Sequence, residues 1–142
     1  MEDNSLLSLE NITMPFSLEA EQAVLGSVLV DPSCLSQAAV YISPESFYLP
    51  QHNAIFAAML MLDGMGTKID PLVVLDQLVQ QGIYDSAAGK NYLFELAQMV
   101  PSTANVEMYA KIVREKFYIR TLIKISSETI ESAVAQEETA DA

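Results

Sequence analysis

The sequence predicts an all-α fold, with a compact head of about six helices followed by one long C-terminal helix. Apolar residues recur at spacings of three and four along most of the chain, as they do on the buried face of a helix. No segment shows the two-residue alternation between turn residues that marks a strand. The one glycine cluster that resembles a hairpin turn, Gly64-Met65-Gly66-Thr67, separates two helical patterns. With 142 residues, 51% of them hydrophobic, the chain can bury the core of one domain.

The first predicted helix follows Ser17 and ends before Pro32. Ser17 is placed to cap it, because a serine hydroxyl accepts a hydrogen bond from the free amides of a first turn. Glu19 and Glu21 are two residues apart and therefore face different directions, which argues against a catalytic carboxylate pair. We interpret both as carboxylates favoured by the positive end of the helix dipole. The apolar stripe of this helix consists of Leu18, Val24, Leu25, Val28 and Leu29.

Prolines mark the starts of the helices that follow. Asp31-Pro32, Ser43-Pro44 and Asp70-Pro71 each place a capping side chain before a proline, whose fixed φ suits the first helical position. Pro50 opens a helix predicted over residues 51–62, and Pro101 precedes the longest helix.

Two further helices are predicted in the second half of the head. Residues 72–81 carry apolar side chains at helical spacing and stop at Gly82, since glycine adopts the left-handed conformation without a Cβ clash. Residues 90–100 form the other helix, with Leu93 and Leu96 on its inner stripe.

Composition sets the predicted domain boundaries. Residues 1–14 are polar and unperiodic, and residues 136–142 are acidic without a large apolar side chain. We therefore expect a flexible N-terminal segment and a disordered acidic tail, because neither segment can offset the entropy lost on ordering. Between them we assign the helical head to residues 15–103 and the long helix to residues 104–135.

The long helix has more apolar surface than one head can cover. At 1.5 Å per residue it extends about 45 Å, which is longer than a small helical bundle. Its apolar residues cover more than one side and continue beyond the part that a small head can reach, through Ile119, Leu122, Ile123 and Ile130. We predict that these four residues form a protein interface with a second helix or a second subunit, and the alternative is packing within one domain core.

The charge of the chain disfavours nucleic acid as a main ligand. A net charge of −12 repels phosphate backbones at long range. Lys116, Arg120 and Lys124 differ from the rest because their i, i+4 spacing aligns three cations on one face of the long helix. We interpret this basic row as a solvated face, and we keep contact with an acidic partner or with single-stranded DNA as the alternative.

The sequence offers no convergent catalytic or metal-binding set. His52, the only histidine, is predicted to be a polar residue in the first turn of its helix, and the only cysteine, Cys34, a small core residue. The stretch from Gly82 to Asn91 lacks the spacing and the hydroxyl of a phosphate loop. We expect no catalytic residue, cofactor or metal. One unpaired cysteine, with neither a leader nor a membrane span, predicts a cytoplasmic protein.

Four segments, in this order, resemble the N-terminal domain of the bacterial replicative DNA helicase, the DnaB family, over roughly residues 15–125. The segments are Ala20-Glu21-Gln22-Ala23-Val24-Leu25-Gly26, Phe47-Tyr48-Leu49-Pro50-Gln51-His52-Asn53-Ala54-Ile55-Phe56, Asp70-Pro71-Leu72-Val73-Val74 and Pro101-Ser102-Thr103-Ala104-Asn105-Val106-Glu107-Met108-Tyr109-Ala110-Lys111-Ile112-Val113-Arg114-Glu115-Lys116.

The resemblance implies a helical head followed by a helical hairpin, of which the long helix is the first arm. It implies self-association into dimers and, in the parent helicase, a hexamer built as a trimer of dimers. A DnaG-type primase and a helicase loader are further implied partners. DNA would be contacted weakly or through the parent ring, and a membrane not at all. ATP and magnesium would serve a motor domain outside this chain, so an interaction domain without enzymatic activity is expected.

Overall fold

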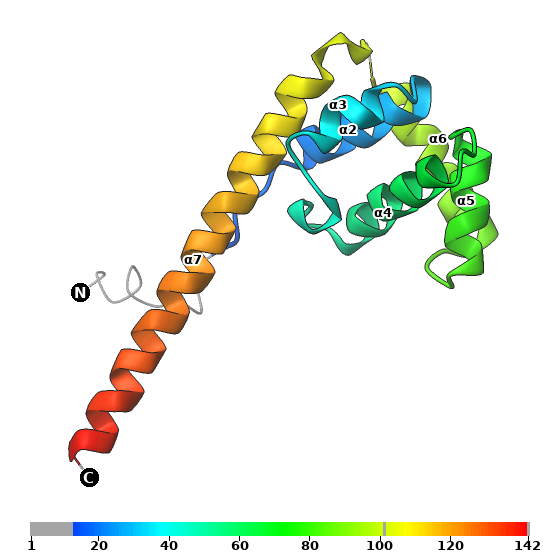
Figure 1. Ribbon diagram of the computed structural model, residues 1–142. Helices are drawn as coiled ribbons and strands as arrows, with labels where there is room; N and C mark the ends of the chain where they lie inside the picture. The colour runs from blue at the N-terminus through cyan, green and yellow to red at the C-terminus, as the bar shows by residue number, and fades with distance from the viewer. Residues whose placement is uncertain (1–12, 101, 142) are drawn as a thin grey trace.

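The computed structural model describes residues 13–100 and 102–141, and this part of the chain is helical without strands (Figure 1). The predicted all-α class is therefore confirmed. The predicted flexible segment, residues 1–14, lies almost wholly outside the described residues. The elements are α2 (Leu18–Val30), α3 (Cys34–Ala39), the 3-10 helix η2 (Pro44–Ser46), α4 (Pro50–Gly64), α5 (Pro71–Gln80), α6 (Ser86–Met99), the 3-10 helix η3 (Thr103–Asn105) and α7 (Val106–Asp141).

Helix α2 is central to the head, because α3, α4, α6 and α7 all pack against it. Its N-terminus is capped as predicted, with the Ser17 hydroxyl accepting a hydrogen bond from the Ala20 amide at 3.1 Å. Gly26 lies where α6 crosses α2. A Cβ atom at this position would overlap the carbonyl oxygen of Leu96, so the absence of a side chain permits the close approach of the two helices.

The core of the head draws on every α-helix of the described chain. Its largest fully buried side chains include Leu25, Leu35, Ile55, Phe56, Met59, Leu78, Leu93 and Leu96. Helix α7 joins this core through its first turns, where Val106, Ala110 and Val113 are buried. These contacts fix the start of α7 to the head, Arg120 adds a further contact with it, and the C-terminal half of the helix extends away (Figure 1).

Some of the predicted helix starts are confirmed and others are wrong. Helix α5 begins at Pro71, with the Asp70 carboxylate accepting from the Val73 amide at 2.9 Å. Helix α3 begins at Cys34, two residues later than Pro32 predicts, because Asp31 accepts hydrogen bonds from both the amide and the hydroxyl of Ser33. That local turn competes with helix initiation at the proline.

Three other predicted elements show mixed outcomes. Ser43-Pro44 starts only the three-residue helix η2, and Pro101 lies outside the described residues. Gly82 ends the α5 region with φ of 74°, in the left-handed conformation predicted for it.

Helix α7 is longer than predicted. It continues to Asp141 and so includes most of the segment, residues 136–142, for which we predicted disorder. The physical reason is that glutamine, glutamate and alanine have high helix propensity, and a preceding helix removes the cost of nucleation. The lack of large apolar side chains keeps this segment from packing against the head, but it does not prevent the backbone from being helical.

Candidate protein-interaction site

The outer side of α7 carries a row of aliphatic side chains that the head does not cover. Ile119, Leu122 and Ile130 are exposed, with 44%, 64% and 52% of their surface accessible, and Ile123 is half-buried. The spacings between these four residues bring them onto one side of the helix. We call this set, Ile119, Leu122, Ile123 and Ile130, the α7 stripe. The head-facing residues Val106, Ala110 and Val113 occupy another side of the same helix.

The predicted basic row is not displayed as three equivalent cations. Lys124 is exposed and Lys116 is half-buried, but Arg120 turns toward the head. Its guanidinium donates to the carbonyl oxygen of Pro15 at 2.9 Å and to that of Ser46 at 2.8 Å. It also lies 5.2 Å from the centre of the Tyr48 ring. The middle cation of the row therefore has a structural role.

Burial lowers the pKa of Arg120, while the negative charge of Glu21 and the Tyr48 phenol act in the opposite direction. The same short segment that Arg120 holds is also held from α4, where the Asn53 amide donates to the carbonyls of Pro44 at 2.5 Å and Phe47 at 2.6 Å. Side chains from two helices thus satisfy the backbone of a segment that has little regular structure of its own.

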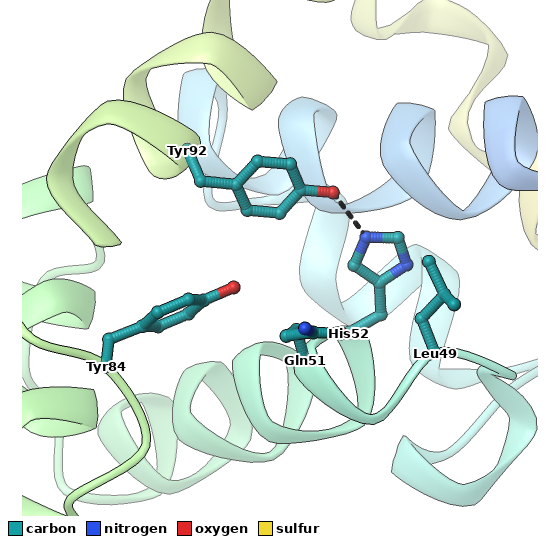
Figure 2. A pocket seen from close by; sticks show the side chains of 5 residues that line it. All are labelled: Leu49, Gln51, His52, Tyr84 and Tyr92. Carbon is teal, nitrogen blue, oxygen red and sulfur yellow. Dashed lines mark hydrogen bonds between the residues drawn. The ribbon is translucent and has the colours of Figure 1, made fainter. Parts of the chain in front are cut away.

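Sequence reasoning missed a buried polar network in the head. His52 has no accessible surface and Glu21 has 1%, and the carboxylate lies 2.7 Å from His52 Nδ1. On the other side of the ring, His52 Nε2 lies 2.6 Å from the Tyr92 hydroxyl (Figure 2). Gln22 donates to that hydroxyl at 3.3 Å. With a proton assigned to Nδ1 from these partners, the imidazole donates to Glu21, and Nε2 shares a second hydrogen bond with the Tyr92 hydroxyl.

Glu21 also binds the backbone that precedes α4. Its carboxylate accepts from the amides of Tyr48 at 2.8 Å and Leu49 at 3.5 Å. Glu21 does lie in the first turn of α2, as the dipole interpretation requires, but its oxygens also serve as acceptors inside the protein, a role that the interpretation did not include. A signal for this was present in the sequence, since Glu21 precedes the buried residues Val24 and Leu25 by three and four positions.

This network is suited to holding helices together and not to bond chemistry. It lacks a nucleophile, and His52, its only imidazole, is inaccessible to solvent. His52 does lie in the first turn of α4, as predicted, but its side chain points into the head. Among residues 13–100 and 102–141, no cluster of histidine, cysteine and carboxylate side chains could hold a metal ion.

Cys34 is a buried core residue, as predicted. Burial raises the pKa of its thiol, and the nearby charge of Asp31 raises it further. The thiol sulfur lies 3.8 Å from the carbonyl oxygen of Thr103. Within the described part of the chain, no helix is both long and apolar enough to cross a membrane.

The comparison with known families agrees with the four segments and with this fold. Residues 13–115 match the family model described as the DnaB-like helicase N terminal domain. The chain belongs to this family. The matched region is the helical N-terminal domain and not the ATPase motor, so the coarse prediction of a replicative helicase N-terminal domain is confirmed.

Relatives of this DnaB-family chain are replicative helicases. It is 41% identical over 127 residues to the replicative DNA helicase DnaB of Geobacillus stearothermophilus, covering 89% of this chain and 28% of that protein. It is 37% identical over 124 residues to the replicative DNA helicase DnaC of Bacillus subtilis (strain 168), covering 87% and 27%. The chain thus spans less than a third of the length of these curated relatives.

Two solved structures share the fold. The N-terminal domain of DnaB helicase from Mycobacterium tuberculosis superposes with a TM-score of 0.85 at 32% identity, covering 89% of this chain and 90% of that one. A DnaB-like replicative helicase, described together with its interactions with primase, superposes with a TM-score of 0.72 at 31% identity, covering 87% and 30%. The predicted head and long helix therefore correspond to a fold that this family uses.

Proposed function

We propose that this domain is a protein-interaction and oligomerisation module of a replicative DNA helicase, and that the α7 stripe is its main contact surface. The observation that carries the proposal is the exposure of this aliphatic row on a helix that extends beyond the head. Leaving apolar surface in water costs about 25 cal/mol per Å² relative to burying it. Aliphatic side chains gathered on one exposed side of a helix in this way are typical of a surface that is covered in an assembly.

The charge distribution along α7 supports a second copy of this chain as one partner. The basic residues of the helix end at its midpoint: they are Lys111, Arg114, Lys116, Arg120 and Lys124, with Glu107 and Glu115 as the acidic residues of the same part. Its second half is acidic, at Glu128, Glu131, Glu137, Glu138 and Asp141. Two such helices packed antiparallel about a two-fold axis would place the acidic half of each beside the basic half of the other. Parallel packing would bring like charges together.

A primase is the second proposed partner. The support is the DnaB-like replicative helicase described with its interactions with primase, to which this chain is 31% identical. In the parent helicase, dimers of this domain would assemble into a hexamer, and ATP and magnesium would serve the motor domain. We infer a DnaG-type primase, a helicase loader and a cytoplasmic setting from the role of these relatives in DNA replication.

Sedimentation velocity across a range of protein concentrations tests the self-association. We expect the chain to form dimers or larger assemblies, and Ile130→Glu to shift the equilibrium toward monomer. Ile125→Glu is the matched control, because Ile125 is similarly exposed, at 55% against 52% for Ile130, and projects about 140° away from Ile130 around α7. A strict monomer at high concentration, or equal effects of the two substitutions, would contradict the role of the stripe.

Isothermal titration calorimetry with a DnaG-type primase tests the second partner. Binding by the unmodified chain is the expected result. If primase binds equally well to the Ile130→Glu variant, its docking surface lies elsewhere on the domain. If no heat is detected at any temperature, the primase proposal is wrong while the self-association proposal stands.

A further inference from the structure

A cavity of about 340 Å³ opens on the head, and none of the side chains that line it belongs to α7 (Figure 2). It is bounded by the first turn of α4, the loop that precedes α6, and α6 itself. The side chains that line it are Leu49, Gln51, His52, Tyr84 and Tyr92. Its volume is at the lower end of the range of about 300–1,000 Å³ for ligand sites, which suits one side chain better than a nucleotide.

The inner wall of this cavity is fixed by the buried network. Tyr92 and His52 lie with nearly parallel rings, 7° apart in plane, and are joined by the hydrogen bond between the Tyr92 hydroxyl and Nε2. Glu21 holds the other ring nitrogen. Because both nitrogens of His52 are engaged, the imidazole is a rigid part of the wall and is not available to a ligand.

Two polar groups at the cavity remain available. Among the described residues, neither the Tyr84 hydroxyl nor the Gln51 side-chain amide has a hydrogen-bond partner. Both carry an oxygen that can accept a hydrogen bond. Burial raises the pKa of Tyr84, and the neighbouring Tyr92 raises it further, which keeps this phenol protonated and neutral near pH 7.

The electrostatic surroundings favour a cation in this cavity. Residues 13–100, the described part of the head, contain nine acidic residues against only Lys68 and Lys90. Burial raises the pKa of the Tyr92 phenol and the Gln22 hydrogen bond lowers it, while the negative charges of Glu95 and of Glu21, which lies behind His52, raise it further. Tyrosine rings attract cations through the negative charge on their faces. The charges of Glu95 and Glu21 would repel an anion.

We propose that the cavity bounded by Tyr84, Tyr92 and Gln51 binds the guanidinium group of an arginine side chain presented by a partner protein. A guanidinium only donates hydrogen bonds, which matches the acceptor oxygens of Gln51 and Tyr84, and its flat face stacks on aromatic rings better than an ammonium does. The site lies on α4, α6 and the loop between α5 and α6. It therefore does not rest on self-association through α7.

The test is an NMR titration of the chain with ring-labelled tyrosine, using N-acetyl-arginine N-methylamide as the probe. Saturable shifts at Tyr84 and Tyr92 are expected, with a dissociation constant on the order of millimolar for one side chain. The matched ligand is the citrulline derivative, which has nearly the same shape without the charge. It should bind at least about five-fold more weakly if cation–π attraction and charge carry recognition.

Protein variants separate the contribution of the Tyr84 ring from that of its hydroxyl. Tyr84→Leu removes both and should weaken binding of the arginine probe about five-fold or more, whereas Tyr84→Phe removes only the hydroxyl and should weaken binding less than Tyr84→Leu. Tyr118→Leu is the control, because Tyr118 is an exposed tyrosine on α7 far from the cavity. Equal binding of the arginine and citrulline derivatives would overturn the proposal. So would the absence of a saturable shift at Tyr84 and Tyr92 up to about 50 mM probe.

Discussion

The Glu21 carboxylate of α2 lies 2.7 Å from Nδ1 of His52 in α4, and both side chains are almost fully buried. The two residues are 31 positions apart, and the contact joins helices that otherwise meet through apolar side chains. A carboxylate that is buried in this way is stable only while its acceptor oxygens are occupied. Here the Tyr48 amide and His52 Nδ1 occupy them, so Glu21 secures both the imidazole and the loop that enters α4.

The first prediction concerns this carboxylate. Glu21→Ala should lower the free energy of unfolding by about 3 kcal/mol or more, because it leaves the His52 ring and the Tyr48 amide buried without an acceptor. Urea denaturation followed by circular dichroism measures the change. Glu19→Ala is the control, since Glu19 is exposed on the same helix and should change stability by less than about 0.5 kcal/mol. Equal losses for the two variants would refute the role of the network.

The second prediction concerns the crossing of α2 and α6. Gly26→Ala should destabilise the head by about 1–3 kcal/mol or more, because the added Cβ overlaps the Leu96 carbonyl and crowds Val100. Gly64→Ala should have the opposite sign and stabilise by about 0.5–1 kcal/mol, since Gly64 is helical and open space surrounds its missing side chain. Thermal unfolding of both variants measures the difference, and a tolerated Gly26→Ala would show that the helices can separate at little cost.

The third prediction separates Arg120 from its neighbours in the basic row. Arg120→Ala should lower the free energy of unfolding by about 1–3 kcal/mol, because it removes two hydrogen bonds to the backbone carbonyls of Pro15 and Ser46. Lys124→Ala removes a charge of the same sign one turn later and should be close to neutral, since Lys124 is exposed. Comparable effects of the two substitutions in urea denaturation would mean that the Arg120 contacts add nothing.

The fourth prediction concerns nucleic acid. With a net charge of −12 and Arg120 engaged within the chain, the domain should show no measurable affinity for single-stranded DNA at 150 mM salt. Fluorescence anisotropy of a labelled oligonucleotide is the measurement. A salt-dependent rise in anisotropy that Lys116→Ala and Lys124→Ala abolish would restore the basic row as a DNA contact.

The features that could be predicted from the sequence are those set by neighbouring residues. Asp70 and Pro71 specify the start of α5, and Gly82 specifies its end, because capping and left-handed backbone are local properties. The exposed aliphatic residues of α7 could be predicted for the same reason, since their spacing in the sequence alone places them on one side of a helix. The residues of the α7 stripe remain a prediction as an interface.

The features that could not be predicted depend on chain segments far apart in sequence. Glu21 meets His52 and Tyr92 only after α2, α4 and α6 have packed, so no local pattern reveals the network. Arg120 has the spacing of a surface row, yet its side chain reaches Pro15, 105 positions earlier. The prediction that a helix starts at Pro32 failed for a different reason: the turn in which Asp31 accepts from the Ser33 amide forms instead of a first helical turn at the proline.

Helix α7 is anchored in the core at Val106, Ala110 and Val113 and continues for 36 residues, or about 54 Å at 1.5 Å per residue. A molecule that binds the C-terminal turns of α7 therefore sets the orientation of the whole head. If α7 pairs with a second copy as we propose, a small tilt at that contact would displace the cavity between Tyr84 and Tyr92 by several ångströms, and the pairing of the two helices would set the distance between the two heads.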